Sequence, residues 1–178
     1  ATIGRMMQKL EQEGMLIKVS NKGRQLTDQG AAYLAAHEQR EEKLHTANKL
    51  IHMVEGSSQT QLLEVLEIRR FLEGRSAELA AQNATPEQIK ELDNIMLEYL
   101  GNEQNLRLHL NVAKISGNRT IYQILNLLLT NENAYTKFSS ASMLDIKHEQ
   151  LEHHENIVSA IKNHDGKGAK LAMERHID

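Results

Sequence analysis

Three of the nine histidines in this 178-residue sequence fall among apolar residues at helical spacing. Side chains three or four positions apart share one face of a helix. The apolar neighbours at that spacing are Leu106, Val112 and Ala113 for His109; Leu151, Ile157, Val158 and Ile161 for His154; and Ala169, Ala172 and Met173 for His176. An imidazole on an apolar face is costly unless a partner satisfies its nitrogen atoms. These three histidines are therefore candidates for a shared site.

A divalent transition metal is the partner that would satisfy all three rings at once. Neutral imidazole is a good ligand for zinc, nickel, copper or iron, and three such ligands leave positions open for water or an effector. Asn105 lies four residues before His109, so its amide oxygen is a candidate fourth donor. The sequence has no cysteine, which excludes thiolate ligands. The spacing alone also allows separately hydrogen-bonded core histidines.

Arg69 is a second anomaly, because it lies on an apolar stripe of a predicted helix. The stripe consists of Leu62, Val65, Leu66, Leu72 and Ser76. A buried arginine needs an anionic partner. That partner is either a carboxylate of the same domain or the carboxylate of a small organic acid bound beside the metal. The remaining histidines are in charged or loop stretches, and we interpret them as surface residues: His37, His45, His52, His148, His153 and His164.

The composition favours helices as the elements that position these residues. Hydrophobic residues make up 40% of the chain and charged residues 25%, with one proline and 3% aromatic residues, which is typical of a folded protein with an aliphatic core. Such a core suits helix-on-helix packing. No apolar run approaches the roughly 18 residues that span a bilayer, so we expect a soluble, cytoplasmic protein with no membrane partner.

The first 27 residues combine a helix with a basic hairpin. Ile3, Met6, Met7 and Leu10 follow the one-face pattern of a helix over 2–13, and two short strands over 15–19 and 24–27 flank an Asn/Gly turn. A helix followed by a basic hairpin is the second half of a winged helix, so we expect residue 1 to be an internal position of that domain. The candidate DNA-contacting residues are Thr2, Arg5, Lys9, Lys22 and Arg24.

Helix start and stop signals divide the rest of the chain into segments. We expect the winged-helix part to cover 1–34, a connecting helix 35–58, and one helical domain 59–178. Within the last, helices are predicted over about 59–82, 86–100, 104–116, 120–131, 141–163 and 166–178. Pro86 begins the second of these, Gly117 ends the third, and Asp165 can cap the last. An antiparallel helical bundle follows.

Three motifs in this order resemble a known family of regulators. Residues 67–81 carry an Arg-Arg, then Leu-Glu, then Ala-Ala pattern. Residues 108–118 carry Leu-His and Ser-Gly-Asn, and residues 154–161, Asp165 and residues 172–176 carry two histidine segments. In these the chain resembles the FadR-like branch of the GntR superfamily, with an FCD effector domain. The resemblance implies a mostly α protein, in which a winged helix precedes an antiparallel FCD-like bundle.

The same resemblance implies function and site residues. It implies a homodimeric transcriptional regulator that binds an operator in double-stranded DNA, with a divalent transition metal, zinc or nickel, on His109, His154 and His176. The family has Asp where this chain has Asn105, which affects metal affinity and identity. Arg69 is the expected contact of a small organic acid effector. The alternatives are a metal-dependent hydrolytic enzyme, since an open metal position can activate water, and a regulator whose metal is purely structural.

Dimerisation is also expected from the helix over 120–131. Its leucines at 125, 127, 128 and 129 point in too many directions to share one core. We therefore expect some of them to remain exposed and to contact a second copy.

Overall fold

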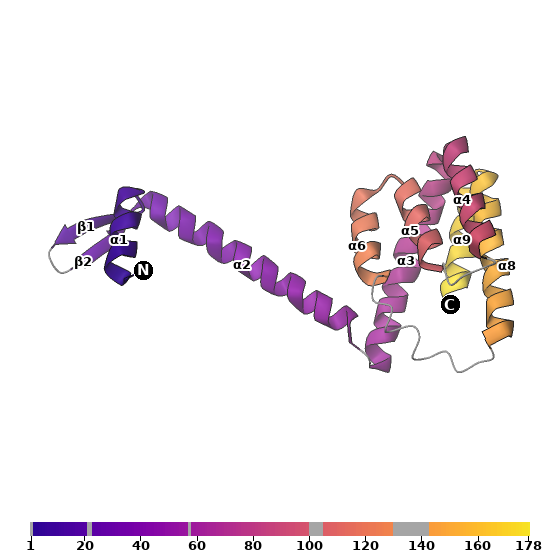
Figure 1. Cartoon of the computed structure of the whole chain (residues 1–178), viewed down its shortest axis with the longest axis horizontal. Helices are drawn as coiled ribbons and strands as arrows, with labels where there is room; N and C mark the ends of the chain where they lie inside the picture. Colours follow the sequence, from indigo (N-terminus) through magenta and orange to yellow (C-terminus); the bar gives the residue numbers. More distant parts are fainter. Residues whose placement is uncertain (1, 21–22, 57, 100–104, 130–142) are drawn as a thin grey trace. The chain divides into compact units, whose positions relative to one another are not determined.

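The computed structural model describes residues 2–20, 23–56, 58–99, 105–129 and 143–178, and within these ranges all side chains except those of 98, 99, 105 and 143–150. The chain is predominantly helical (Figure 1). It divides into two compact units, Ala1–Leu50 and Ile51–Asp178. Among the described helices, none is both long and apolar enough to cross a membrane.

The first unit contains the predicted helix and hairpin. Helix α1 (Ile3–Gln12) is followed by strands β1 (Leu16–Ser20) and β2 (Gly23–Leu26), which pair antiparallel, and then by α2 (Asp28–Val54). Gly14 ends α1 with φ of 74°, a conformation that glycine adopts without strain. A Cβ on Gly30 would come within 2.1 Å of the Met15 carbonyl oxygen, so α2 can start this close to β1 only with glycine there.

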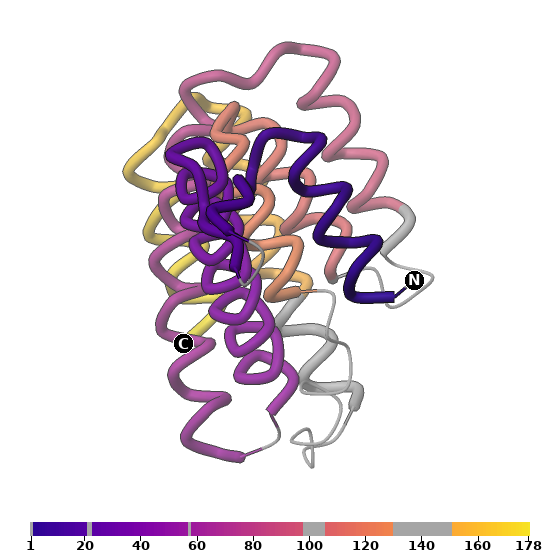
Figure 2. The backbone as a smooth tube through the Cα atoms, turned by 90° about the vertical axis from the view of Figure 1, so that its left-hand side faces the viewer, coloured from indigo at the N-terminus to yellow at the C-terminus, as the bar shows by residue number. Residues whose placement is uncertain are grey.

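The second unit is a bundle of helices whose boundaries agree closely with the predicted ranges. Its described helices are α3 (Gln59–Asn83), α4 (Pro86–Tyr99), α5 (Asn105–Ile115), α6 (Arg119–Leu129), α8 (Met143–Lys162) and α9 (Gly166–Ile177). Helices α3, α5 and α6 run side by side in both views (Figures 1 and 2), and α9 contacts both α3 and α8. The mostly α fold, with a partial winged helix before a helical bundle, is confirmed.

Local signals explain where these helices start and stop. Thr85 and Gln88 cap α4 reciprocally: each side-chain oxygen accepts the other residue's backbone N–H. The Asp165 carboxylate accepts the backbone N–H of Gly168 at 2.9 Å, which caps α9 as predicted. Gly117 ends α5 with φ of 74°. The loops that these caps define bring α5, α8 and α9 together around one core.

Two apolar clusters hold the bundle together. The larger joins α3, α4, α5, α8 and α9, and the smaller joins the end of α2 to α5 and α6 through Val54, Ala113, Leu125, Leu128 and Leu129. The inner face of α3 is made of small residues that let α9 approach closely: Gly74, Ala77, Ala80 and Ala81. A Cβ on Gly74 would lie 2.9 Å from Cγ of Glu174 on α9. This close approach brings the end of α9 to the middle of α3.

Fewer leucines of α6 are available to a second copy than the sequence suggests. Leu125, Leu128 and Leu129 are buried in the smaller cluster, and Leu127 is partly buried. The three buried leucines pack against the end of α2 and against Val65 and Leu72 of α3. The sequence alone does not indicate these neighbours. Three of the four α6 leucines therefore belong to the core of one chain, and the partial burial of Leu127 agrees with the expectation that the four do not share one core.

Candidate metal centre

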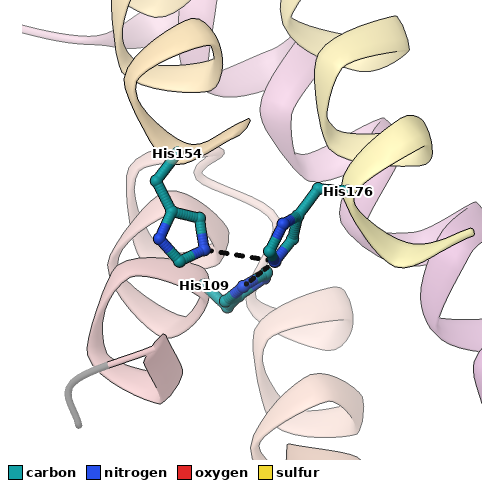
Figure 3. Close-up of side chains that lie close together, drawn as sticks. All are labelled: His109, His154 and His176. Atoms are coloured by element: carbon teal, nitrogen blue, oxygen red, sulfur yellow. Dashed lines mark hydrogen bonds between the residues drawn. The ribbon is translucent and has the colours of Figure 1, made fainter. Parts of the chain in front are cut away.

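Three histidines from three helices converge in the bundle. His109 of α5, His154 of α8 and His176 at the end of α9 point toward one another (Figure 3). Nε2 of His176 lies 3.1 Å from Nε2 of His109 and 3.1 Å from Nε2 of His154. One ligand atom from each residue lies within 4.8 Å of the others. His109 and His154 are buried, and His176 is partly buried.

Hydrogen bonds among the three rings cannot satisfy all of their nitrogen atoms. Nδ1 of His109 contacts the Glu73 carboxylate, which favours the tautomer that donates its proton there and leaves Nε2 as an acceptor. Nε2 of His176 faces the Nε2 atoms of both other rings, and one N–H can serve only one of them. Nδ1 of His176 is buried without a hydrogen-bond partner among the described residues. A metal cation bound between the rings would accept these nitrogen lone pairs.

The spacing of the nitrogens fits one transition-metal ion. With metal–nitrogen bonds of about 2.0–2.1 Å, neighbouring nitrogens on one ion lie about 2.9–3.4 Å apart. The two separations from Nε2 of His176, each 3.1 Å, fall inside this range, and one ligand atom from each of the three residues lies within 4.8 Å of the others. The donor set of three imidazoles suits zinc, nickel, copper or iron, and not calcium or magnesium, which prefer oxygen. The residues present therefore fit the metal that the sequence motifs imply.

Burial keeps two of the rings neutral. Burial, followed by repulsion from His109, lowers the pKa of His154 to about 3. The same two causes lower the pKa of His176 to about 2, and His154, His153 and Arg69 add to the effect. Imidazole binds metal only when deprotonated. At neutral pH both rings present a lone pair without first having to lose a proton.

Glu73 is a site residue that the sequence analysis missed. It is buried on α3, contacts Nδ1 of His109 through one carboxylate oxygen and accepts Nε–H of Arg69 at 2.7 Å through the other. Burial alone would raise the pKa of Glu73, but His109 and Arg69 together outweigh it and lower that pKa. A carboxylate on the second nitrogen of a histidine ligand fixes its tautomer and orientation. The available signal was the i, i+4 spacing of Glu73 from Arg69 on the same helix face.

Arg69 makes the intramolecular salt bridge that was one of its two predicted roles. It is 8% exposed and is joined to Glu73. Its charge helps to lower the pKa of His176, so it acts within electrostatic range of the histidine cluster. The chain of contacts runs from Arg69 through Glu73 to His109. A carboxylate effector at Arg69 stays a prediction.

The other histidines divide into two groups. His37, His45, His52 and His164 are exposed, as predicted, although Nδ1 of His164 also pairs with the Ala81 carbonyl oxygen at 2.8 Å. His153 is partly buried, and its ring packs edge-on against His176 with centroids 5.9 Å apart, because α9 ends beside this part of α8. His148 and the proposed donor oxygen of Asn105 lie outside the described side chains.

Ion pairs hold the end of α9 that carries His176. Nε of Arg70 on α3 lies 2.7 Å from a carboxylate oxygen of Asp178, and its Nη2 lies 4.0 Å from one of Glu174. These pairs are partly exposed, so each contributes little stability. They lie near the close contact between Gly74 of α3 and Glu174 of α9.

The candidate DNA-contacting residues lie in the first unit. Arg5 and Lys9 are exposed on α1, where Lys9 also lies 3.7 Å from Glu13, and Thr2 precedes the first turn of that helix. Nε of Arg24 on β2 donates to Glu11 at 2.6 Å, so this guanidinium is engaged with α1. Lys22 lies outside the described residues. The exposed basic residues described in this part of the chain therefore lie on both α1 and the hairpin, where Lys18 and Arg24 are exposed.

Comparisons with known proteins identify the family. The FCD domain family matches residues 64–178, which includes all three histidines, Glu73 and Arg69. The chain therefore belongs to the FCD domain family. None of the curated proteins compared with the chain matches its sequence.

Two solved structures share the fold of the chain. McbR/YncC of E. coli superposes with a TM-score of 0.59 at 14% identity, over 97% of this chain and 74% of that one. A GntR protein of Streptococcus agalactiae superposes with a TM-score of 0.55 at 19% identity, over 98% of this chain and 78% of that one. The FCD domain that the sequence motifs indicate is confirmed by the family match, and the fold of the chain is similar to that of these two structures.

Proposed function

We propose that this chain is a DNA-binding transcriptional regulator that holds one divalent transition metal in its FCD domain on His109, His154 and His176. Zinc and nickel are the metals that best suit this donor set. The metal would leave at least one position open for an exchangeable ligand, and a small organic acid would occupy it as the effector. Effector binding would then change how two winged helices engage an operator.

The observation that carries this proposal is the convergence of three histidine rings, with Nε2 of His176 at metal-ligand spacing from Nε2 of both others. Glu73 supports it, because a carboxylate behind a histidine is the usual outer partner of a metal ligand. Asn105 begins α5 one turn before His109, so its amide oxygen can supply a further donor. An amide carries no charge, so the ion would keep more of its positive charge for an anionic effector than it would beside a carboxylate.

A carboxylate effector fits the charges around the cluster. Three neutral imidazoles leave the ion with its full double charge, and Arg69 adds a buried cation within range. Glu73 supplies a single compensating negative charge. The excess of positive charge favours an anion at the open position. Loss of the anion would leave the excess positive charge of the loaded centre uncompensated, whereas loss of the metal would leave Arg69 and Glu73 as a balanced pair.

The same geometry does not favour a hydrolytic enzyme. Metal-activated water needs a nearby base that can accept its proton. The Glu73 carboxylate is engaged by Arg69 and His109, and the pKa of Glu73 is lowered, which makes it a poor base. We therefore propose a regulatory role for the centre.

The test measures DNA binding with and without metal, on a chain whose winged helix has been completed, because residues 2–26 supply only one helix and a hairpin of that domain. Selection from a random DNA pool identifies the operator, and affinity is then measured on chelated protein, on zinc- or nickel-loaded protein, and on loaded protein with a panel of small organic acids. We expect salt-dependent binding whose affinity changes with metal and with at least one acid. His176→Ala should remove both responses, whereas the matched control His37→Ala should retain them. A chain that binds no DNA at low salt, or whose binding ignores metal and every acid, contradicts the proposal.

A further inference from the structure

His153 on α8 lies beside the histidine cluster and has no role in the proposed function. Its side chain is partly buried, and its ring packs edge-on against that of His176, with ring centroids 5.9 Å apart. The ring of His176 also packs against that of His154, with centroids 4.4 Å apart. His176 therefore contacts two consecutive histidines of α8, of which only His154 belongs to the cluster.

The geometry of α8 places His153 beside the cluster and not in it. Consecutive residues of an α-helix point about 100° apart, because the helix has about 3.6 residues per turn. The side chain of His154 points into the cluster (Figure 3), so that of His153 leaves the helix in a different direction. The ligand atoms that lie within 4.8 Å of one another are those of His109, His154 and His176. His153 is thus a neighbour of the centre and not a fourth ligand.

The three ligands of the cluster differ in how far they are buried. His154 is fully buried and His109 is 2% exposed, whereas His176 is partly exposed. His176 is therefore the most accessible ligand of the three, and it is the ligand that the ring of His153 contacts. We call His153 and His176 the rim pair, because both rings are reached by solvent and one of them belongs to the cluster.

The α3 side of the cluster is unfavourable for an entering cation. Arg69 is buried there, and its charge acts on His176. Glu73 is also buried, and both of its carboxylate oxygens are engaged, by Arg69 and by His109. Repulsion between like charges is stronger where burial excludes water. The rim pair lies on α8 and α9, away from this buried positive charge.

A divalent ion in water must lose bound water molecules before the cluster can hold it. Moving an ion out of water is costly unless other contacts replace those that it loses. A ligand at the rim lowers this cost, because it replaces one water while the ion is still partly solvated. Imidazole suits this exchange, since its nitrogen lone pair binds zinc, nickel and copper.

We propose that His153 is the entry ligand of the metal centre, which binds an incoming divalent transition metal through its imidazole and passes it to His176. The step exchanges one nitrogen ligand for another on the same ion. No electron is transferred, the charge of the ion does not change, and water leaves as each imidazole binds. His153 is released once the cluster holds the ion, so it speeds loading and release without adding to the affinity. This role rests on the proposed metal centre and on no other part of the proposed function.

Rapid mixing of the metal-free full chain with cobalt(II) tests this role. Cobalt(II) accepts the same nitrogen ligands as zinc, and its visible absorption reports binding to the cluster. His153→Ala should slow uptake about tenfold, which corresponds to a barrier about 1.4 kcal/mol higher. Release to a chelator should slow by the same factor, because His153 is a ligand only during passage. The Kd should therefore match that of wild type.

Two matched controls separate the ring of His153 from its surroundings. Glu152→Gln removes an exposed charge one position earlier on α8, and His52→Ala removes an exposed histidine of the same unit. Both should load at the wild-type rate. Slowing in either control equal to that in His153→Ala overturns the proposal, as does a wild-type uptake rate in His153→Ala. A raised Kd with an unchanged uptake rate would make His153 a support of His176 and also overturns it.

The variant His153→Cys tests whether the ion contacts this position on its way to the cluster. The chain has no cysteine, so this variant has a single thiol, and thiolate is a good ligand for zinc and cobalt. Fast uptake should return, and a thiolate-to-cobalt charge-transfer band should rise and then decay as the ion moves to the cluster. A role of His153 in packing alone predicts neither result. Absence of the band, or uptake as slow as in His153→Ala, overturns the proposal.

These outcomes are distinguishable from failure of the proposed function. A wild-type chain that binds no metal refutes both the metal centre and the entry role. A chain that loads at the same rate with and without the His153 ring refutes only the entry role. A chain that loads through His153 but whose DNA binding ignores metal refutes the proposed regulation and leaves the entry role standing.

Discussion

The buried histidines predict that the metal-free protein loses stability in mild acid. The pKa values of His154 and His176 in the folded chain are about 3 and about 2. In the unfolded chain a histidine has a pKa of about 6.5. Between these values the unfolded chain binds more protons than the folded chain, so the free energy of unfolding falls as the pH falls.

The number of protons that the chain takes up on unfolding gives the size of this loss in the free energy of unfolding. Each proton taken up only on unfolding changes the free energy of unfolding by about 1.4 kcal/mol per pH unit. From pH 7.5 to 5.5, His154 and His176 together should therefore cost about 2–3 kcal/mol. Glu73 has a lowered pKa, so its contribution is lost only as the pH falls through that lower value, below this range.

The assay is urea unfolding of the chelated chain, followed by far-UV circular dichroism at pH 7.5 and 5.5. The double variant His154→Leu with His176→Leu should lose most of the pH dependence, since it removes the groups that take up protons. His37→Leu, at an exposed position of α2, is the matched control and should keep it. A metal-free wild type with equal stability at both pH values would refute the neutral, buried state of these two rings.

Three further predictions concern the metal and its support. Replacing any one of the three cluster histidines by Ala should remove most bound metal in elemental analysis, while His153→Ala should retain it; equal loss in all four variants would count against the assigned ligand set. Asn105→Asp adds a charged oxygen one turn before His109 and should lower the zinc Kd in calorimetric titration, an effect that separately hydrogen-bonded core histidines would not produce. Glu73→Ala leaves Arg69 buried without this carboxylate and should cost about 3–5 kcal/mol in urea unfolding, and a cost below about 1 kcal/mol would mean that the pair is solvated.

The sequence was sufficient to predict the helices because their signals are local. Proline at the start of α4, glycine after α5 and aspartate before α9 act within a few residues, and the described boundaries of the bundle helices are close to the predicted ones. Periodicity was enough to select His109, His154 and His176, since each lies on the apolar face of its own helix. The pattern does not show whether the three apolar faces meet, and in the structure they do.

What the sequence could not supply was the packing between elements. Glu73 is separated from His109 by 36 positions, and only the close approach of α3 and α5 makes them partners. Leu125, Leu128 and Leu129 of α6 are covered by the end of α2 and by α3, a choice of neighbours that helical periodicity does not determine. The partial burial of His153 likewise depends on where α9 ends.

Anomalous diffraction from crystals of the zinc-loaded chain tests the central claim most directly. We predict one anomalous peak per chain, about 2.0–2.1 Å from the Nε2 atoms of His109, His154 and His176, with Glu73 still on Nδ1 of His109. A loaded crystal with no peak among these three rings, or with the zinc bound elsewhere while the rings are hydrogen-bonded to one another, would contradict the account.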